Sequence, residues 1–508
     1  MKRTTLLSLS LSVIALSTTA CDDAEPAASA TPDKPAAAAK DAPAKAEVAK
    51  ADAKTDTKTD APDDGKDAAA AEDEEVVEIE DEDEDEDAEA GEAEVAKAEA
   101  APDAADPAKA DATNAAFFDV RDRGIVALTD EGFVTVPASN VYVARFVHGG
   151  DGKLYAQTSG KVVHVQTSGL STVAELDYGT VGSVKAIDVG SGGEIWAVGT
   201  NGISEYKDGS WTTTSKADAG LADDFEVGLA LDADGEPWAA TSSSIVHRVD
   251  GKWVAASLPK GKTKYLDRMG RGPDGNVYLS TYSDLFRMTG TPGKVALKKG
   301  RFDSPGKFAF SQATLGVARS GLQDVSVFHP ADKAARFTGK ADLKVGNISA
   351  VAADDAGRVW AAGDGGVAVV GPGSERVTWR SGTFEEIAGQ ISEMAVRGAG
   401  PKLPEAGEVK KGGMKGNVIQ GGKPLANAAI ELCESPSFIY RRTPCEGSPT
   451  HLSGVTDAEG KYQFENVPLG AYGIAVKVGR KWQITMGAAL GTKMIAGETY
   501  DLGSFTVK

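Results

Sequence analysis

Residues Gly193–Ile203 read Gly-Glu-Ile-Trp-Ala-Val-Gly-Thr-Asn-Gly-Ile, a short apolar stretch between glycine-containing turns. Weaker versions of this stretch recur at Gly152–Val162, Gly235–Ile245, Gly275–Leu285 and Gly357–Val367. Their aromatic residues are spaced 41, 42, 40 and 82 residues apart, the last interval being two repeats: Tyr155, Trp196, Trp238, Tyr278 and Trp360. A unit of about 41 residues made of short strands and tight turns indicates a repeat architecture.

Each repeat has the same order of strand and turn signals. An apolar strand such as Val184–Val189 comes first, and an Asp-Gly or Gly-Gly turn follows, where glycine supplies the positive φ of a two-residue hairpin. The aromatic residue lies in the second strand, and turns such as Asp208-Gly209 precede a fourth. Four antiparallel strands per repeat predict a β-propeller over residues 116–400. We expect the aromatic residues to be core between blades, with ligand stacking as the alternative.

The two ends of this region supply one further blade. Leu315 takes the aromatic position in a degenerate sixth repeat. Ile391–Val396 resembles a first strand with nothing after it, and Gly124–Val136 resembles second and third strands with nothing before them. Pairing the two would join the ends and remove an open sheet edge. The sequence therefore predicts seven blades, with six as the alternative.

The repeat Asp-x-x-Gly-x-hydrophobic-Trp, followed by Gly-hydrophobic, resembles the propeller repeats of two-component-regulator sensors. The resemblance covers most of residues 116–400. It implies an extracytoplasmic sensing or binding module, often for carbohydrate.

A second pattern occupies residues 413–508, after a linker at 401–412. Gly416–Ile419 and Ala429–Leu432 are expected to be strands and Thr456–Phe464 a hairpin, which together predict a small antiparallel β-sandwich. The motifs Gly-x-Val, Pro-Leu-x-x-Ala, Thr-Asp-x-x-Gly-x-Tyr-x-Phe and Val-Pro-x-Gly-x-Tyr are similar to the carboxypeptidase regulatory-like, transthyretin-like domain. That resemblance implies a prealbumin-like fold and no catalysis.

An insertion at Glu434–Leu452 interrupts this module and contains Arg441 and Arg442. Cys433 and Cys445 are expected to form a disulfide in an oxidising compartment, which would stabilise the fold by roughly 3 kcal/mol. The alternative is two unpaired thiols. A cysteine pair without a nearby histidine or further cysteine is a poor zinc site. The insertion is either a binding loop or only a stapled loop.

Residues 1–20 are expected to be an export signal. Lys2 and Arg3 precede an apolar run, Leu6–Leu16, that is too short to span a bilayer as a helix. The sequence Thr18-Thr19-Ala20-Cys21 resembles the end of a bacterial lipoprotein signal, although Thr18 stands where leucine is usual. The resemblance implies lipid attachment at Cys21 and a membrane-anchored protein facing the periplasm or the cell surface. Ordinary secretion with a free cysteine is the alternative.

Residues 22–115 contain 32 acidic and 9 basic residues and no aromatic residue. The net charge of the whole chain is −21, so the excess of acid belongs to this segment and residues 116–508 are balanced. Such a segment buries too little apolar area to offset its conformational entropy. We expect residues 21–115 to be a disordered tether, with docking to a basic partner or cation buffering as the alternative role.

Motifs for catalysis, cofactors and metals are missing from the sequence. Its five histidines show no metal-ligand spacing, and no His-Glu-x-x-His, Gly-x-Ser-x-Gly or phosphate-loop motif occurs. The basic residues form no cluster interleaved with aromatic residues, which argues against nucleic acid as a partner. We therefore expect no cofactor and no metal.

Propeller ligands usually lie in or over the central channel, near the first strands. In an alignment of the repeats, we call the position ten residues before each aromatic residue the aligned column. This column holds Arg145, Arg268 and, through the split blade, Glu393, where the other repeats have alanine or glycine. We expect the three charged side chains to converge on a carbohydrate or an anionic small molecule. The alternatives are exposure at the strand mouths or mutual neutralisation.

The sequence thus favours a lipid-anchored envelope protein, not an enzyme, that presents a propeller to a ligand or a protein partner. A metal-dependent propeller enzyme of lactonase or streptogramin-lyase type is one alternative. It would need carboxylates, amides or histidines around a divalent cation, where the aligned column has two arginines and one glutamate. A passive adhesion or assembly scaffold is the other alternative.

Overall fold

The computed structural model describes residues 111–222, 227–256, 266–281, 285–288, 307–310, 315–319, 324–329, 334–338, 343–373, 375–434, 436–490 and 494–508. Almost all regular structure in these ranges is β-strand, which confirms the all-β prediction. The one helix that they contain is α1 (Lys216–Ala219), which is capped by Ser215 and by Gly220 in a left-handed conformation.

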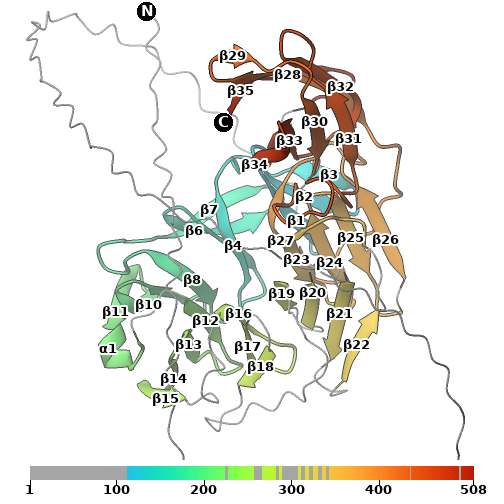
Figure 1. Cartoon of the computed structure of the whole chain (residues 1–508). Helices are drawn as coiled ribbons and strands as arrows, with labels where there is room; N and C mark the ends of the chain where they lie inside the picture. Colours follow the sequence, from blue (N-terminus) through green and yellow to red (C-terminus); the bar gives the residue numbers. More distant parts are fainter. Residues whose placement is uncertain are drawn as a thin grey trace, which may run out of the picture. The chain divides into compact units, whose positions relative to one another are not determined.

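Seven antiparallel sheets precede the C-terminal module in the described residues (Figure 1). Six of them consist of strands consecutive in sequence. The first three are β4 (Val143–His148), β5 (Leu154–Thr158), β6 (Lys161–Gln166) and β7 (Gly169–Glu175); β8 (Val184–Val189), β9 (Ile195–Gly199), β10 (Gly202–Lys207) and β11 (Ser210–Ser215); and β12 (Val227–Leu231), β13 (Pro237–Thr241), β14 (Ile245–Val249) and β15 (Lys252–Ala256). The next three are β16 (Leu266–Arg271), β17 (Val277–Thr281) and β18 (Leu285–Met288); β19 (Lys307–Phe310), β20 (Leu315–Arg319), β21 (Asp324–His329) and β22 (Ala334–Thr338); and β23 (Ile348–Ala353), β24 (Val359–Gly363), β25 (Gly366–Val370) and β26 (Arg376–Arg380).

The seventh sheet joins the two ends of the propeller. Its strand order is β27 (Ile391–Arg397), β1 (Ala115–Val120), β2 (Gly124–Thr129) and β3 (Gly132–Thr135). The C-terminal strand β27 is innermost, as the sequence predicts. The prediction that Gly124–Val136 supplies the second and third strands is wrong, because this stretch supplies the third and fourth strands, β2 and β3. The fully buried strand β1 comes between β27 and β2, and it begins at Ala115, inside the segment assigned to the tether.

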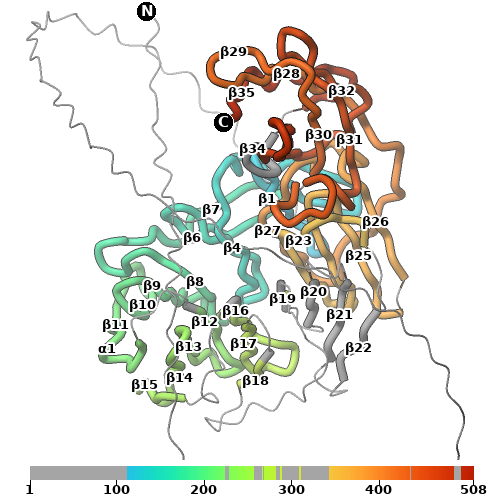
Figure 2. The backbone as a smooth tube through the Cα atoms, in the orientation of Figure 1, coloured from blue at the N-terminus to red at the C-terminus, as the bar shows by residue number. Residues whose placement is uncertain are grey.

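The first strands of these sheets form a closed ring, because β4, β8, β12, β16, β19, β23 and β27 contact one another in turn and β27 contacts β4. Figure 2 traces the backbone from β4 through β8 and β12 to β23 and β27 around this ring. The chain is therefore a β-propeller protein, in which each first strand faces a central channel.

A glycine in the turn before the second strand is a recurring feature of the blades. Gly193 has φ +82°, and a Cβ there would meet no atom within 4 Å, so backbone conformation rather than crowding explains the glycine. The aromatic residues that follow are all buried. In four repeats the ring also donates a hydrogen bond to the turn aspartate: Tyr155 to Asp151, Trp238 to Asp232, Tyr278 to Asp274 and Trp360 to Asp354.

The C-terminal module is a sandwich of two four-stranded sheets. One contains β28 (Lys411–Gln420), β29 (Lys423–Pro424), β32 (Lys461–Pro468) and β35 (Thr499–Val507), and the other β30 (Ala429–Cys433), β31 (His451–Val455), β33 (Tyr472–Val478) and β34 (Lys481–Leu490). Side chains from both sheets share one core, Met414 and Phe464 from the first and Ile430 and Ile474 from the second. The expected hairpin at Thr456–Phe464 is wrong, because the turn connects β31 to β32 across the two sheets.

Hydrogen bonds attach the sandwich to the segment that follows β26 in the propeller. The Ser381 hydroxyl donates to the Leu469 carbonyl at 2.8 Å, and the Lys410 backbone N–H donates to the Gly382 carbonyl at 2.9 Å. Ala388 of the propeller belongs to the core cluster of the sandwich. The two domains therefore share buried contacts.

Candidate functional site

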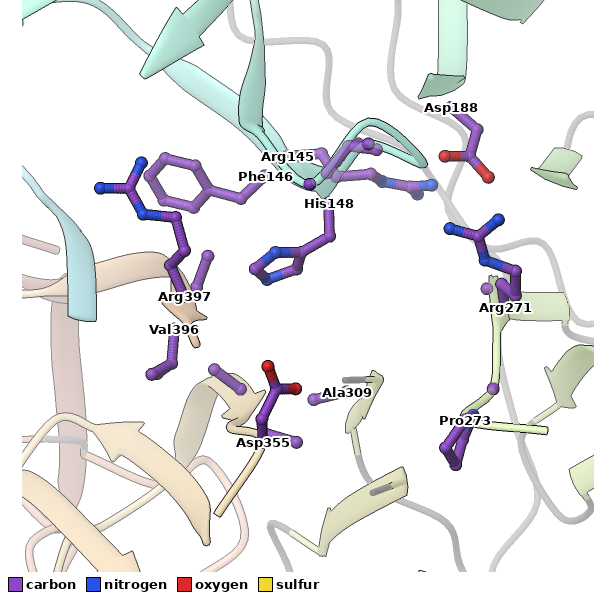
Figure 3. Close-up of a pocket in the computed structure, with 18 of the residues that line it drawn as sticks. Arg145, Phe146, His148, Asp188, Arg271, Pro273, Ala309, Asp355, Val396 and Arg397 are labelled. Atoms are coloured by element: carbon purple, nitrogen blue, oxygen red, sulfur yellow. The ribbon is translucent and has the colours of Figure 1, made fainter. Parts of the chain in front are cut away.

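A cavity of about 830 Å³ lies where the first strands end (Figure 3). Each of the seven first strands contributes to its wall: Arg145–His148, Ile187–Asp188, Leu229, Arg268–Arg271, Ala309, Val351–Ala353 and Met394–Arg397. Residues Asp111, Thr113 and Asn114, which precede β1, lie at the same cavity. The cavity is thus the end of the propeller channel, and its volume is that of a small-molecule site.

Two of the three residues predicted from the aligned column are in direct contact. The Arg268 Nη2 atom is 3.1 Å from the Glu393 Oε1 atom, and Arg268 also donates to the Phe308 carbonyl at 3.5 Å. Arg145 and Arg268 both line the cavity, whereas Glu393 pairs with Arg268 from deeper in β27. The arrangement corresponds to the alternative of mutual neutralisation for this pair.

Arg145 faces a different carboxylate, that of Asp188 at the end of β8. Figure 3 shows the Arg145 and Arg271 guanidinium groups extending toward Asp188 from two sides. The Asp188 carboxylate also accepts backbone hydrogen bonds from Val189 at 2.8 Å and from Leu231 at 2.7 Å. Two backbone donors and two cations therefore fix one acceptor at the cavity wall.

Burial in the channel raises the pKa of Asp188 to about 6, although the hydrogen bonds from Leu231 and Val189 and the charges of Arg271 and Arg145 act in the opposite direction. The carboxylate is partly exposed to the cavity. It is ionised at neutral pH and takes up a proton in mild acid.

A second pair lies at the rim of the cavity. The Arg397 Nη1 atom is 2.5 Å from the Asp111 Oδ2 atom, and Arg397 also donates to the Ala112 carbonyl. Burial alone would raise the pKa of Asp111, but hydrogen bonds from Arg397 and Thr167 bring it below the usual value. This pair fastens the segment before β1 to the end of β27.

His148 and Asp355 point into the opening from opposite walls (Figure 3). The His148 ring is exposed to the cavity but enclosed by the channel, and this enclosure and the Arg397 charge lower its pKa to about 4. The imidazole is therefore neutral at physiological pH. Among the described residues, no group of three or more histidine, cysteine, aspartate or glutamate side chains could hold a metal ion.

The sulfur atoms of Cys433 and Cys445 are bonded, with the Cα atoms 5.6 Å apart, a separation that a disulfide spans without strain in the backbone. Cys21, the predicted lipidation site, lies outside the described residues. In the part of the chain that the structure describes, no helix is long and apolar enough to cross a membrane.

The aligned column missed four cavity residues, Asp188, Arg271, Asp355 and Arg397. A signal for them exists in the sequence, because each is a charged residue at or just after the end of an apolar first strand. The column ten residues before the aromatic position lies two to five residues upstream of these four residues. A search of the strand ends, rather than of one column, would have found them.

No protein-family model matches the chain, and no curated protein matches it. Among solved structures it is similar to a streptogramin B lyase, at 17% identity, with 52% of this chain and 87% of that chain covered and a TM-score of 0.38. It is also similar to the extracellular domain of a hybrid two-component system protein from B. thetaiotaomicron, at 13% identity, 68% and 54% coverage and a TM-score of 0.37. The third likeness is to YCF48 from Cyanidioschyzon merolae, at 12% identity, 49% and 92% coverage and a TM-score of 0.35. Similarity at this level does not extend to ligand or activity.

Proposed function

We propose that this chain is an extracytoplasmic binding protein whose propeller channel takes a neutral, hydroxyl-rich ligand such as a saccharide. The observation that carries the proposal is the cavity wall, where four arginines lie beside carboxylates instead of forming an uncompensated cationic surface: Arg145, Arg268, Arg271 and Arg397.

The pairing of charges supports a neutral ligand over an anionic one, the two ligand classes expected from the sequence. Arg268 pairs with Glu393, Arg397 pairs with Asp111, and Arg145 and Arg271 flank Asp188. An anionic ligand would have to compete with these carboxylates for the guanidinium groups. A sugar hydroxyl can accept from a guanidinium and donate to the adjacent carboxylate at once. The Arg397–Asp111 pair, and Asp188 with its two arginines, all line the cavity and suit hydroxyl groups without being broken.

Anchoring at a membrane is the second part of the proposal. It rests on the export signal, on Cys21 and on the acidic segment that separates Cys21 from the propeller. A polar segment of this length would keep the channel accessible to soluble ligands away from the lipid surface. Replacing Cys21 with serine should move the protein from the membrane to the soluble envelope fraction, and unchanged membrane association would reject lipidation.

The ligand proposal is tested with the full-length Cys21→Ser protein. Isothermal titration or saturation-transfer NMR would compare neutral oligosaccharides with sugar acids and dicarboxylates. The Arg271→Ala variant should lose at least about tenfold in affinity for a saccharide that binds, because one charged hydrogen-bonding group is removed. Arg380→Ala, at an exposed position of β26, is the matched control and should bind normally.

Other outcomes would separate the remaining functions. Binding of sugar acids or dicarboxylates alone would assign the cavity to anions. Chemical turnover of a bound compound that depends on His148 would favour an enzyme, since the His148 imidazole lines the cavity. Binding of no small molecule from either panel would favour the scaffold.

A further inference from the structure

The sandwich carries an exposed apolar tip outside the propeller cavity. It lies in the loop between β30 and β31, where six successive residues are exposed: Ser437, Phe438, Ile439, Tyr440, Arg441 and Arg442. Phe438 is 81% exposed and Ile439 is 93% exposed, the two largest exposed fractions among the large hydrophobic residues that the structure describes. Two large apolar side chains in water are unfavourable unless something covers them during function.

The two ends of this loop are held together at its base. The Cys433–Cys445 disulfide joins its two sides, and the Ser437 N–H donates to the Pro444 carbonyl at 2.8 Å. Glu434 is buried and accepts from the Ser448 hydroxyl and the Thr450 N–H. A preorganised loop loses little conformational entropy when its tip is buried.

We propose that this loop docks the protein on an anionic lipid bilayer, with Phe438 and Ile439 entering the boundary of the acyl chains and Arg441 and Arg442 contacting lipid headgroups. Aromatic and aliphatic side chains next to arginines match the two layers of a membrane surface, apolar below and anionic above. The exposed carboxylate of Glu446 accepts from the backbone N–H of Arg442 at 3.0 Å, so this acidic group is engaged at the base of the loop.

The size of the tip favours lipid over a protein partner. Two side chains of this kind bury at most a few hundred Å², whereas a stable protein interface needs roughly 1,000 Å² and a complementary pocket. A bilayer needs no preformed pocket and accepts a small protrusion. The inference is independent of the cavity ligand, because no residue of the loop lines the cavity.

Vesicle co-sedimentation of the full-length Cys21→Ser protein tests the proposal without a lipid anchor. Vesicles of phosphatidylcholine are compared with vesicles that also contain phosphatidylglycerol, at low and at physiological salt. The Phe438→Ser/Ile439→Ser variant should lose at least about tenfold in partitioning to both kinds of vesicle. The Arg441→Gln/Arg442→Gln variant should lose about tenfold on the anionic vesicles and change little on the neutral ones.

Ile495→Ser is the matched control, since Ile495 is an isoleucine of the same module that is 52% exposed outside the loop. It should partition as the parent protein does, and thermal unfolding should show that all variants are folded. Equal partitioning of the loop variants and the parent would overturn the proposal, as would an equal loss in Ile495→Ser. A dimer in sedimentation velocity that disappears in Phe438→Ser/Ile439→Ser, without vesicle binding, would reassign the tip to contact with a second copy.

Discussion

The turn between β23 and β24 and the end of β8 each place an aspartate beside arginine, with opposite surroundings. Asp354 is fully buried and accepts hydrogen bonds from the Arg358 Nε at 2.6 Å, the Arg358 N–H at 2.8 Å and the Trp360 Nε1 at 2.9 Å. Asp188 accepts hydrogen bonds from two backbone N–H groups and lies between two guanidinium groups, but it remains partly open to the channel. Aspartate and arginine thus stabilise a buried turn of one blade at Asp354, whereas at Asp188 they line the cavity that we propose binds a ligand.

The largest expected effect is on the blade turn. Asp354→Ala should lower the free energy of unfolding by about 3 kcal/mol, because the buried indole N–H of Trp360 loses its acceptor and the half-buried guanidinium of Arg358 loses its carboxylate partner. Urea denaturation measures this loss. Asp151→Ala, at the corresponding turn of another blade, removes a more exposed carboxylate and should cost only about 1 kcal/mol. A smaller loss for Asp354→Ala than for a change at Asp188 would reverse the comparison.

The Cys433–Cys445 disulfide is a second feature that should affect stability without affecting binding at the cavity. Replacing Cys433 and Cys445 together with serine should lower the stability of the sandwich by about 3 kcal/mol, through the added freedom of the unfolded chain. Thermal unfolding measures the loss, and mass spectrometry of unreduced peptides should find the two cysteines linked. Binding at the propeller cavity should not change in this variant, and two freely alkylated thiols in the native protein would rule the bond out.

Asp188→Asn is expected to have a smaller effect that depends on pH. The carboxyl pKa rises from 3.8 to about 6 in the folded protein, mainly through burial, so between these values the folded state binds a proton that the unfolded chain has released. The stability contributed by this group is therefore present below pH 4, falls as the pH rises to about 6 and is constant above that.

Relative to the parent protein, Asp188→Asn should consequently gain stability between pH 4 and pH 6.5. Free energies of unfolding at several pH values test this, and the difference between the two proteins cancels the titration of the other carboxylates. A pH-independent difference would show that Asp188 does not titrate in this range.

The smallest stability effect is expected for Arg271→Ala. The side chain donates a long hydrogen bond to the Asp232 carbonyl, at 3.4 Å, and its charge is partly open to solvent, so the loss should be below about 1 kcal/mol. Removing this cation should raise the pKa of Asp188 further, since one favourable charge is lost. NMR titration of the Asp188 carboxyl carbon would detect the shift, and an unchanged pKa would separate Arg271 from Asp188.

The propeller was predictable from the sequence because its blades repeat the same physical solution. Glycine in the turn and a buried aromatic residue on the next strand recur at a fixed interval, and Gly193 and Trp196 show both features in the structure. Strand β1 was not predicted, because Ala115–Val120 has no turn glycine before it and carries no repeat motif. Its six buried residues are visible only once β27 and β2 flank it.

The cavity was less predictable, because it depends on where side chains from different repeats meet. The aligned column found Arg268 and Glu393, which form an ion pair. The partner of Arg145 is Asp188, whose alignment position is two residues later in a different blade. Alignment of the repeats compares equivalent positions in different blades. The ring instead brings together side chains at inequivalent positions of neighbouring blades, and this proximity does not appear as a periodicity in the sequence.

The pairing of β27 with β1 also has a consequence for the making of the protein. Ser392 and Asp119, which are hydrogen-bonded across these strands, are 273 residues apart in the chain. The three strands synthesised first therefore have no innermost partner until the last strand of the ring has emerged. A chain interrupted before Ile391 leaves this sheet without its inner edge and the ring unclosed. The propeller can therefore close only after the chain has been translated through β27, and a truncated product with an open ring is expected to be more susceptible to proteolysis.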